Sequence, residues 1–153
     1  MKILKWLLIL LVSIPIVLIT SVYVRNKAIG PAGWAEDNTV KALKAYMKDP
    51  DSMVVRSSYT LSSTNADGDM EIRICGIVDG KNSFGGYTGG TRFVSKSVRN
   101  KRFETFDTNF VKIEDSEETA RALKLEMLSG FDKVYWNEYC VDSAHPPTKP
   151  SKL

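Results

Sequence analysis

The sequence contains very little of the side-chain chemistry on which most small enzymes and metal sites depend. It has one histidine, His145, and two cysteines, Cys75 and Cys140, in 153 residues. His145 lies in a proline-rich C-terminal segment, so the folded part has no histidine for a serine triad, a cysteine–histidine dyad or a zinc site. Two cysteines cannot build a four-thiolate zinc site, and there is no Cys-x-x-Cys redox motif. We therefore expect no catalytic residues of these kinds, no metal and no cofactor.

A surplus of positive charge is also missing from most of the chain. The formal net charge is +3, but Lys2 and Lys5 precede a long apolar run. From Arg25 onward, 19 basic residues are balanced by 18 acidic residues. Binding of nucleic acid needs a face with excess positive charge, so we do not expect a nucleic-acid partner.

One segment near the N-terminus lacks formal charges altogether. Residues 6–24 (WLLILLVSIPIVLITSVYV) follow a short basic tail, residues 1–5, and precede Arg25. As a helix they would be about 28 Å long, close to the hydrocarbon thickness of a bilayer, with Trp6 and Tyr23 at headgroup level. We predict a transmembrane anchor in contact with the lipid bilayer. The alternatives are a cleaved signal peptide, whose apolar core is usually shorter, and a buried soluble helix.

The basic tail favours a single-pass protein of a bacterial inner membrane, with its N-terminus inside and its C-terminal domain in the periplasm or exterior. The pair of cysteines agrees with this location, because disulfides persist in oxidising compartments. A Cys75–Cys140 disulfide would close a loop of about 65 residues and would stabilise the fold by about 4 kcal/mol at most. The alternatives are two free thiols in a cytosolic domain, and secretion after signal cleavage.

The rest of the chain predicts an α+β domain, residues 38–140, between a linker, residues 25–37, and a disordered proline-rich tail, residues 141–153. Strict alternation in the first strand would place Val55 and Tyr59 on the same face. We expect a small antiparallel sheet of three to four strands packed against two to three helices on one of its faces. The apolar spacing predicts helices over 38–48, 116–128 and 131–139, and strands over 53–61, 70–78, 91–95 and 110–113.

A glycine-rich loop, residues 80–90 (GKNSFGGYTGG), connects the second and third predicted strands. Dense glycine allows the backbone to approach a ligand closely, which makes Lys81, Asn82 and Tyr87 candidate binding residues. The order of residues matches neither a phosphate loop nor a dinucleotide fingerprint. The alternative is a wide hairpin connection whose glycines adopt positive φ.

Two clusters of like charge follow this loop. The first cluster is basic, and its member Arg92 is a fourth candidate binding residue. This cluster could contact anionic headgroups, an acidic partner or a polyanion. The alternative is a solvated charged edge that resists strand aggregation. The second is acidic and is expected to complement the N-terminus of the following helix. The basic cluster is Arg92, Lys96, Arg99, Lys101 and Arg102, and the acidic cluster is Glu114, Asp115, Glu117 and Glu118.

Several segments together carry a resemblance to a known family. They are KDPDS at residues 48–52, Cys-Gly-x-Val at residues 75–78, Lys-Asn-x-x-Gly-Gly-Tyr-x-Gly at residues 81–89, and Trp136 followed by Cys140. Over about residues 40–140, the chain resembles an uncharacterised family of small exported proteins of bacteria and phages. Where that family has asparagine, this chain has Asp79. The resemblance implies export and the pairing of Cys75 with Cys140, and it implies no activity.

Three functions are compatible with these observations. The favoured hypothesis is a non-enzymatic, membrane-anchored domain that binds an envelope protein or an anionic surface through residues 80–90 and the adjoining basic cluster. A second is a small hydrolase with a carboxylate active site, which requires two carboxyl groups with raised pKa values in a cleft. A third is an assembly protein that oligomerises through its transmembrane helix.

Overall fold

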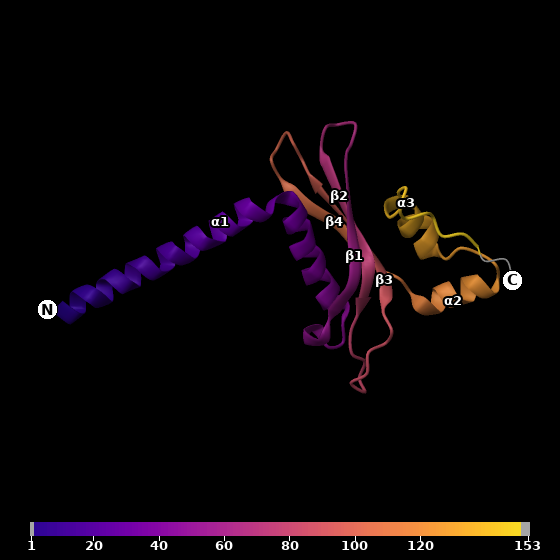
Figure 1. The fold of residues 1–153 in the computed structure, drawn as a ribbon, viewed down its shortest axis with the longest axis horizontal. Helices are drawn as coiled ribbons and strands as arrows, with labels where there is room; N and C mark the ends of the chain where they lie inside the picture. The colour runs from indigo at the N-terminus through magenta and orange to yellow at the C-terminus, as the bar shows by residue number, and fades with distance from the viewer. Residues whose placement is uncertain (1, 151–153) are drawn as a thin grey trace. The chain divides into compact units, whose positions relative to one another are not determined.

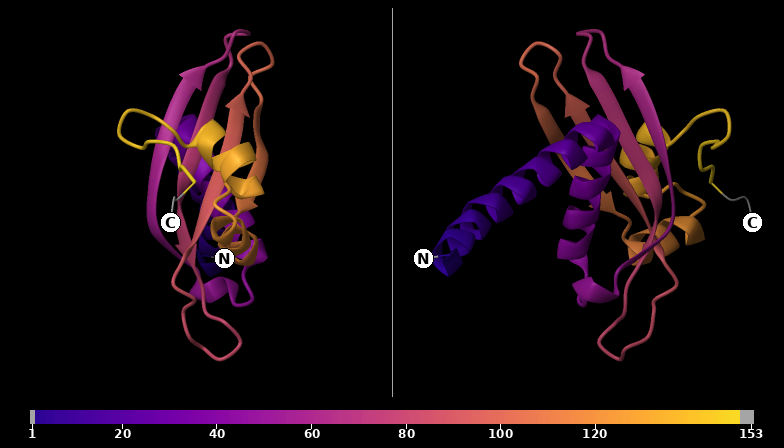
Figure 2. Two further views of the ribbon diagram at one scale, coloured as in Figure 1. Left: turned by 90° about the vertical axis from the view of Figure 1, so that its right-hand side faces the viewer. Right: turned by 60° about the vertical axis from the view of Figure 1, so that its left-hand side comes forward.

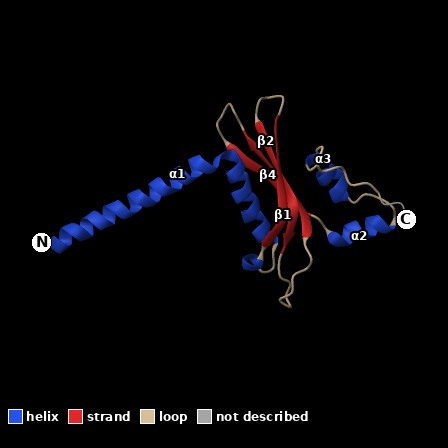
Figure 3. Cartoon of the chain, in the orientation of Figure 1, coloured by secondary structure: helices blue, strands red, loops and turns tan. Residues whose placement is uncertain are grey.

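The chain forms two compact units, Met1–Trp34 and Ala35–Leu153, of which the computed structural model describes residues 2–150. One long helix, α1 (Lys2–Tyr46), begins in the first unit and ends in the second (Figure 3). The second unit contains a four-stranded antiparallel sheet and further helices, so the predicted α+β class is confirmed.

By length and composition, the first part of α1 is long and apolar enough to cross a membrane. None of the residues in the apolar stretch that the structure describes is buried. Pro15 lies inside the helix without ending it. The hydroxyls of Thr20 and Ser21 donate to main-chain carbonyl oxygens one turn earlier, at 2.7 and 2.8 Å. These polar groups are therefore satisfied within the helix itself, as the interior of a bilayer requires.

The predicted linker, residues 25–37, is helical on both sides of one break. Gly30 has a non-helical backbone, with φ 61° and ψ −168°. The residue before a proline avoids helical geometry, whereas Pro31 itself suits the first turn of a new helix. The Trp34 indole donates to the main-chain oxygen of Asn26 across the break, at 3.1 Å. The break therefore lies at a single residue, Gly30.

The sheet has the simplest antiparallel order, in which each strand pairs with the next along the chain (Figure 1). After a short 3₁₀ turn, η1 (Pro50–Ser52), the strands are β1 (Val54–Thr64), β2 (Met70–Asp79), β3 (Thr91–Arg99) and β4 (Phe106–Ile113). The predicted strands are all present, and each is longer than expected. The glycine-rich loop joins β2 to β3 at one end of the sheet.

A bulge at Arg56 changes which side chains of β1 share a face. Val55 is opposite Val78 but Ser57 is opposite Ile77, so the register shifts by one residue between them. A one-residue insertion moves every later side chain to the other face of the sheet. Val55 therefore packs with the core on one face, whereas Tyr59 packs with the core on the other. The prediction that they share a face is wrong for this reason.

Helices cover both faces of the sheet, not one as predicted. On one face, Ala35 and Leu43 of α1 pack against β2, β3 and β4. On the opposite face, Phe131 and Cys140 pack against β2 and β3. Figure 2 shows the second half of α1 and the C-terminal helices on opposite sides of the sheet. Because β2 and β3 are buried on both faces, the two cores share the same strands. The buried side chains are Ala35, Leu43, Ile72, Ile74, Val78, Phe93 and Val111 on the α1 face, and Cys75, Val94, Phe131 and Cys140 on the other.

The C-terminal part contains α2 (Ser116–Lys124), a π-helical turn η2 (Asp132–Trp136) and α3 (Asn137–Tyr139). Cys75 and Cys140 form the predicted disulfide. Residues 141–150, which the sequence predicts as a disordered tail, contact the folded domain at two places. The Asn137 side-chain amide exchanges two hydrogen bonds with the backbone of Thr148, at 2.8 and 2.9 Å. The His145 ring stacks on Tyr59 at 3.7 Å.

Candidate functional site

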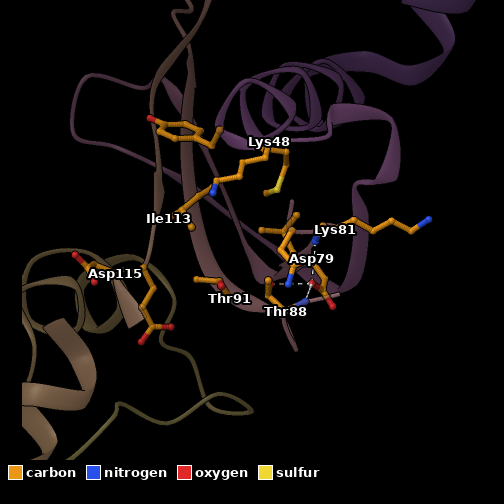
Figure 4. A pocket seen from close by; sticks show the side chains of 13 residues that line it. Lys48, Asp79, Lys81, Thr88, Thr91, Ile113 and Asp115 are labelled. Carbon is orange, nitrogen blue, oxygen red and sulfur yellow. Dashed lines mark hydrogen bonds between the residues drawn. The ribbon is translucent and has the colours of Figure 1, made fainter. Parts of the chain in front are cut away.

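A cleft of about 460 Å³ opens in the second unit, where α1 ends beside the β2–β3 loop (Figure 4). Its floor is apolar, with Met47, Val78 and Ile113, and its rim carries charged and hydroxyl side chains. The lining residues are Tyr46, Met47, Lys48, Val78, Asp79, Gly80, Lys81, Asn82, Thr88, Thr91, Ile113, Glu114 and Asp115. We call this the sheet-end cleft. An apolar floor with a few polar groups is the usual composition of a binding site.

Asp79 fixes the base of the loop to the end of β2. One carboxylate oxygen accepts hydrogen bonds from the Gly80 amide, the Thr88 amide and the Thr88 hydroxyl, at 2.8, 3.1 and 3.2 Å. The other accepts from the Arg56 guanidinium at 2.8 Å. Arg56, supported by the loop hydrogen bonds, lowers the pKa of Asp79 to about 2, against the opposing effect of burial. Because this folded-state pKa is depressed, the stabilisation is present above the ordinary pKa of 3.8 and is lost as the pH falls toward 2.

Asn82 shapes the tip of the loop, as a turn-forming residue does, instead of facing a ligand. Its side-chain oxygen accepts from the amides of Phe84 and Gly86, at 2.9 and 3.1 Å. Its backbone amide donates to the Gly86 oxygen at 2.8 Å. Gly85 has φ 80°, a conformation that other residues rarely adopt. The interpretation of residues 80–90 as a hairpin connection with positive-φ glycines therefore describes its backbone.

These turn contacts constrain the backbone around an aromatic residue whose side chain is exposed to solvent. Phe84, at the tip, is 97% exposed. An apolar ring presented on a constrained loop has little conformational entropy left to lose on binding, and aromatic residues are enriched in protein interfaces. The sequence prediction missed Phe84; the only signal was one apolar residue inside a polar, glycine-rich turn.

Lys81 and Tyr87 pair across the loop as an isolated antiparallel bridge. The Tyr87 hydroxyl donates to the Ser52 carbonyl at 3.3 Å, and the Lys81 amide donates to the Ser52 hydroxyl at 2.9 Å. The Arg56 guanidinium lies 5.1 Å from the centre of the Tyr87 ring. Figure 4 shows the Lys81 side chain pointing away from the sheet-end cleft. Three predicted binding residues thus lie on one loop, and Lys81 and Tyr87 expose side chains on the same loop as Phe84.

Arg92 is separated from that loop surface, because it faces the opposite side of the sheet from the α1 core. Its guanidinium donates to Glu114 at 2.6 Å and to Asp132 at 2.8 Å. It also lies 4.9 Å from the Trp136 ring and 5.4 Å from the Phe131 ring. Arg92 therefore connects β3 to the end of β4 and to the C-terminal helices. We interpret it as a structural residue.

The basic cluster does not form one surface. Lys96 pairs with Glu71 at 3.0 Å and lies above the Tyr139 ring. Arg102 lies in the β3–β4 turn with its guanidinium 5.4 Å from the Phe103 ring. In the acidic cluster, Asp115 accepts hydrogen bonds from two backbone amides of the first turn of α2, in agreement with its expected capping role.

The carboxyl groups of the sheet-end cleft are all hydrogen-bonded anions. Burial acts to raise the pKa of Glu114, but the hydrogen bonds and charge of Arg92 outweigh it and hold that pKa below its ordinary value. The first-turn amides lower the pKa of Asp115, chiefly that of Glu118. The hydrolase hypothesis requires two carboxyl groups with raised pKa values in a cleft, whereas the pKa values of Asp79, Glu114 and Asp115 are all lowered. Among residues 2–150, no three or more His, Cys, Asp or Glu side chains gather in a way that could hold a metal ion.

Replacing Asp79 tests whether this carboxylate immobilises the loop. In Asp79→Ala, we expect backbone amide exchange over residues 82–88 to accelerate by roughly tenfold, because local opening no longer breaks hydrogen bonds to Asp79. Asp79→Asn keeps an acceptor for Gly80 and Thr88 and loses only the charge opposite Arg56, so its effect should be smaller. Hydrogen-exchange mass spectrometry on the full-length chain in detergent measures both. Equal exchange in wild type and Asp79→Ala would contradict the assignment.

Comparisons with known proteins identify no family for this chain. No family model matches the chain, and neither a curated protein nor a solved structure matches it. The resemblance to small exported proteins stays a prediction from the sequence. The chain therefore combines an apolar helix, a disulfide-linked α+β domain and a hydrogen-bonded loop that carries an exposed phenylalanine beside a cleft.

Proposed function

We propose that this protein is a non-enzymatic, membrane-anchored domain that presents the loop of residues 80–90 to another envelope protein. The observation that carries the proposal is Phe84, which is 97% exposed on a loop that Asp79 and Asn82 hold in one conformation. An exposed phenylalanine on a hydrogen-bonded loop offers a partner apolar contact area with little conformational entropy left to lose.

The surroundings of Phe84 support a protein partner. Tyr87 and Lys81 expose part of their side chains on the same loop. The sheet-end cleft lies beside the loop and offers an apolar floor with backbone and hydroxyl groups at its rim. Interfaces usually combine an aromatic anchor, an apolar centre and a polar rim. A partner segment that covers Phe84 and enters the cleft would bury all three.

The proposed location is a bacterial inner membrane, with the α+β domain in the periplasm or exterior. Its support is the apolar first part of α1, which can serve as an anchor or as a signal sequence. The disulfide between Cys75 and Cys140 adds support, because such bonds persist outside the reducing cytosol. We favour a retained anchor, since the apolar run is long for a signal peptide.

The experiment compares two exposed phenylalanines at opposite ends of the sheet. Phe84→Ala in the full-length chain should reduce the amount of a co-purified envelope protein by roughly tenfold after crosslinking in native membranes. Phe103→Ala is the matched control, because Phe103 is also exposed, at 68%, but lies in the β3–β4 turn. Neither change should alter folding, since both rings are solvated.

Two results would overturn the proposal. One is a partner that is recovered equally well with Phe84→Ala, with Phe103→Ala and with the wild type. The other is full-length protein that alkaline carbonate releases from the membrane fraction, since a retained apolar helix resists that treatment.

A further inference from the structure

The helix α2 presents an apolar face that the domain does not cover. None of its residues, all of which the structure describes, is buried. Leu123 is 51% exposed, and Leu125 and Met127, in the turn that closes the helix, are 69% and 51% exposed. By helical spacing, Ala120 and Leu123 lie on one face of α2, and Met127 follows beyond the end of the helix. The structure leaves these side chains in solvent.

The order of charges along α2, with an exposed Glu117–Arg121 ion pair at 3.6 Å, would also complement a second helix that runs in the opposite direction. The acidic residues lie in its first turn and the basic residues in its last turn. Glu117 and Lys124 are seven residues apart, about two helical turns, so they lie on one flank of the apolar face. In two antiparallel copies of one helix, equivalent flanks meet. Glu117 of each copy would then lie opposite Lys124 of the other, and Ala120 and Leu123 would be enclosed between them.

We infer that the apolar face of α2 docks, antiparallel, against α2 of a second copy of this chain. The surface is self-complementary in charge, as a two-fold interface requires. An anionic lipid surface fits less well, because four acidic and only two basic residues lie between Asp115 and Glu126. One helix per copy is smaller than a standard protein interface. The dimer is therefore weak on its own and is strengthened when both copies share a membrane.

This interface rests on the proposed membrane anchor but not on the proposed binding loop, because neither Phe84 nor the sheet-end cleft contributes to it. The test uses the full-length chain in native membranes, with a photocrosslinking amino acid in place of Ala120. We expect a covalent dimer in which position 120 is joined to α2 of the other copy, identified by mass spectrometry. The same crosslinker in place of Phe103 should give no such dimer.

Variants on the apolar face of α2 and on its flank test the geometry of the contact. Leu123→Asp should lower the dimer yield at least about tenfold, because it puts a charge at the centre of the contact. Lys124→Glu should lower it roughly threefold, and Glu117→Lys combined with Lys124→Glu should restore it, since the exchanged charges again face each other. Phe84→Ala should leave the yield unchanged.

Several outcomes would overturn the inference. These are a monomer only, crosslinks to lipid or to a different protein, or a dimer whose yield does not respond to Leu123→Asp. A dimer that forms through the apolar part of α1 alone would also contradict the inference. Such a dimer would persist in Leu123→Asp and would lack the crosslink to α2.

Discussion

Replacing Cys75 and Cys140 together by serine is expected to lower the free energy of unfolding by about 4 kcal/mol at most. The disulfide joins the middle of β2 to the end of α3, across a sequence separation of 65 residues. Without it, the unfolded chain regains the entropy of an open loop of that length. Urea unfolding of the full-length protein in detergent, followed by tryptophan fluorescence, measures the difference.

The expected loss is large because the core on the disulfide side of the sheet is small. Besides the two cysteines, its fully buried apolar members are Val94 and Phe131. Wild-type protein in reductant should unfold like the double serine variant, and reductant should not affect that variant further. Leu125→Ala, which alters an exposed side chain, is the control for substitution itself. A midpoint unchanged by reductant, or maleimide labelling of both thiols in native membranes, would contradict a structural disulfide.

Removing Arg92 is expected to destabilise the domain by roughly 3 kcal/mol, because two largely buried carboxylates would lose their cation. The side chains of Glu114 and Asp132 are only 10% and 5% exposed. Arg92→Met keeps much of the apolar stem that packs near Trp136, so it isolates the loss of charge. If Arg92 were instead a binding residue on the surface, its replacement would change stability by less than about 0.5 kcal/mol. Arg102→Met provides that comparison, since Arg102 is exposed in a turn.

The pH dependence of unfolding gives a second measure of the same network. Burial tends to raise the pKa values of Glu114 and Asp132, but Arg92 outweighs it and lowers both. A depressed folded-state pKa stabilises the protein above the unfolded-state pKa, about 4, and this stabilisation is lost as the pH falls below it. Wild-type stability should therefore decrease between about pH 5 and pH 3, and Arg92→Met should show a flatter profile. Parallel profiles for the two proteins would contradict the assigned ion pairs.

The candidate site could be predicted only in its local features. Glycine spacing identified the loop of residues 80–90, because a wide turn needs positive φ and glycine supplies it. The roles within the loop depended on hydrogen bonds that composition does not reveal. Asn82 turns its side chain inward to the backbone, and Phe84 faces solvent. Asp79 depends on Arg56, 23 residues earlier, and that arginine reaches it from a strand bulge.

The sequence alone determined the features that rest on local periodicity and composition. These are the apolar helix near the N-terminus, the positions of the four strands, the capping of α2 and the two cysteines available for a disulfide. Tertiary structure alone decided which side chains meet. The bulge at Arg56 sends Val55 and Tyr59 to opposite faces, helices occupy both faces of the sheet, and Arg92 pairs with Asp132 across 40 residues. The physical reason is that local patterns fix the elements, whereas strand register and long-range packing fix the partners of each side chain.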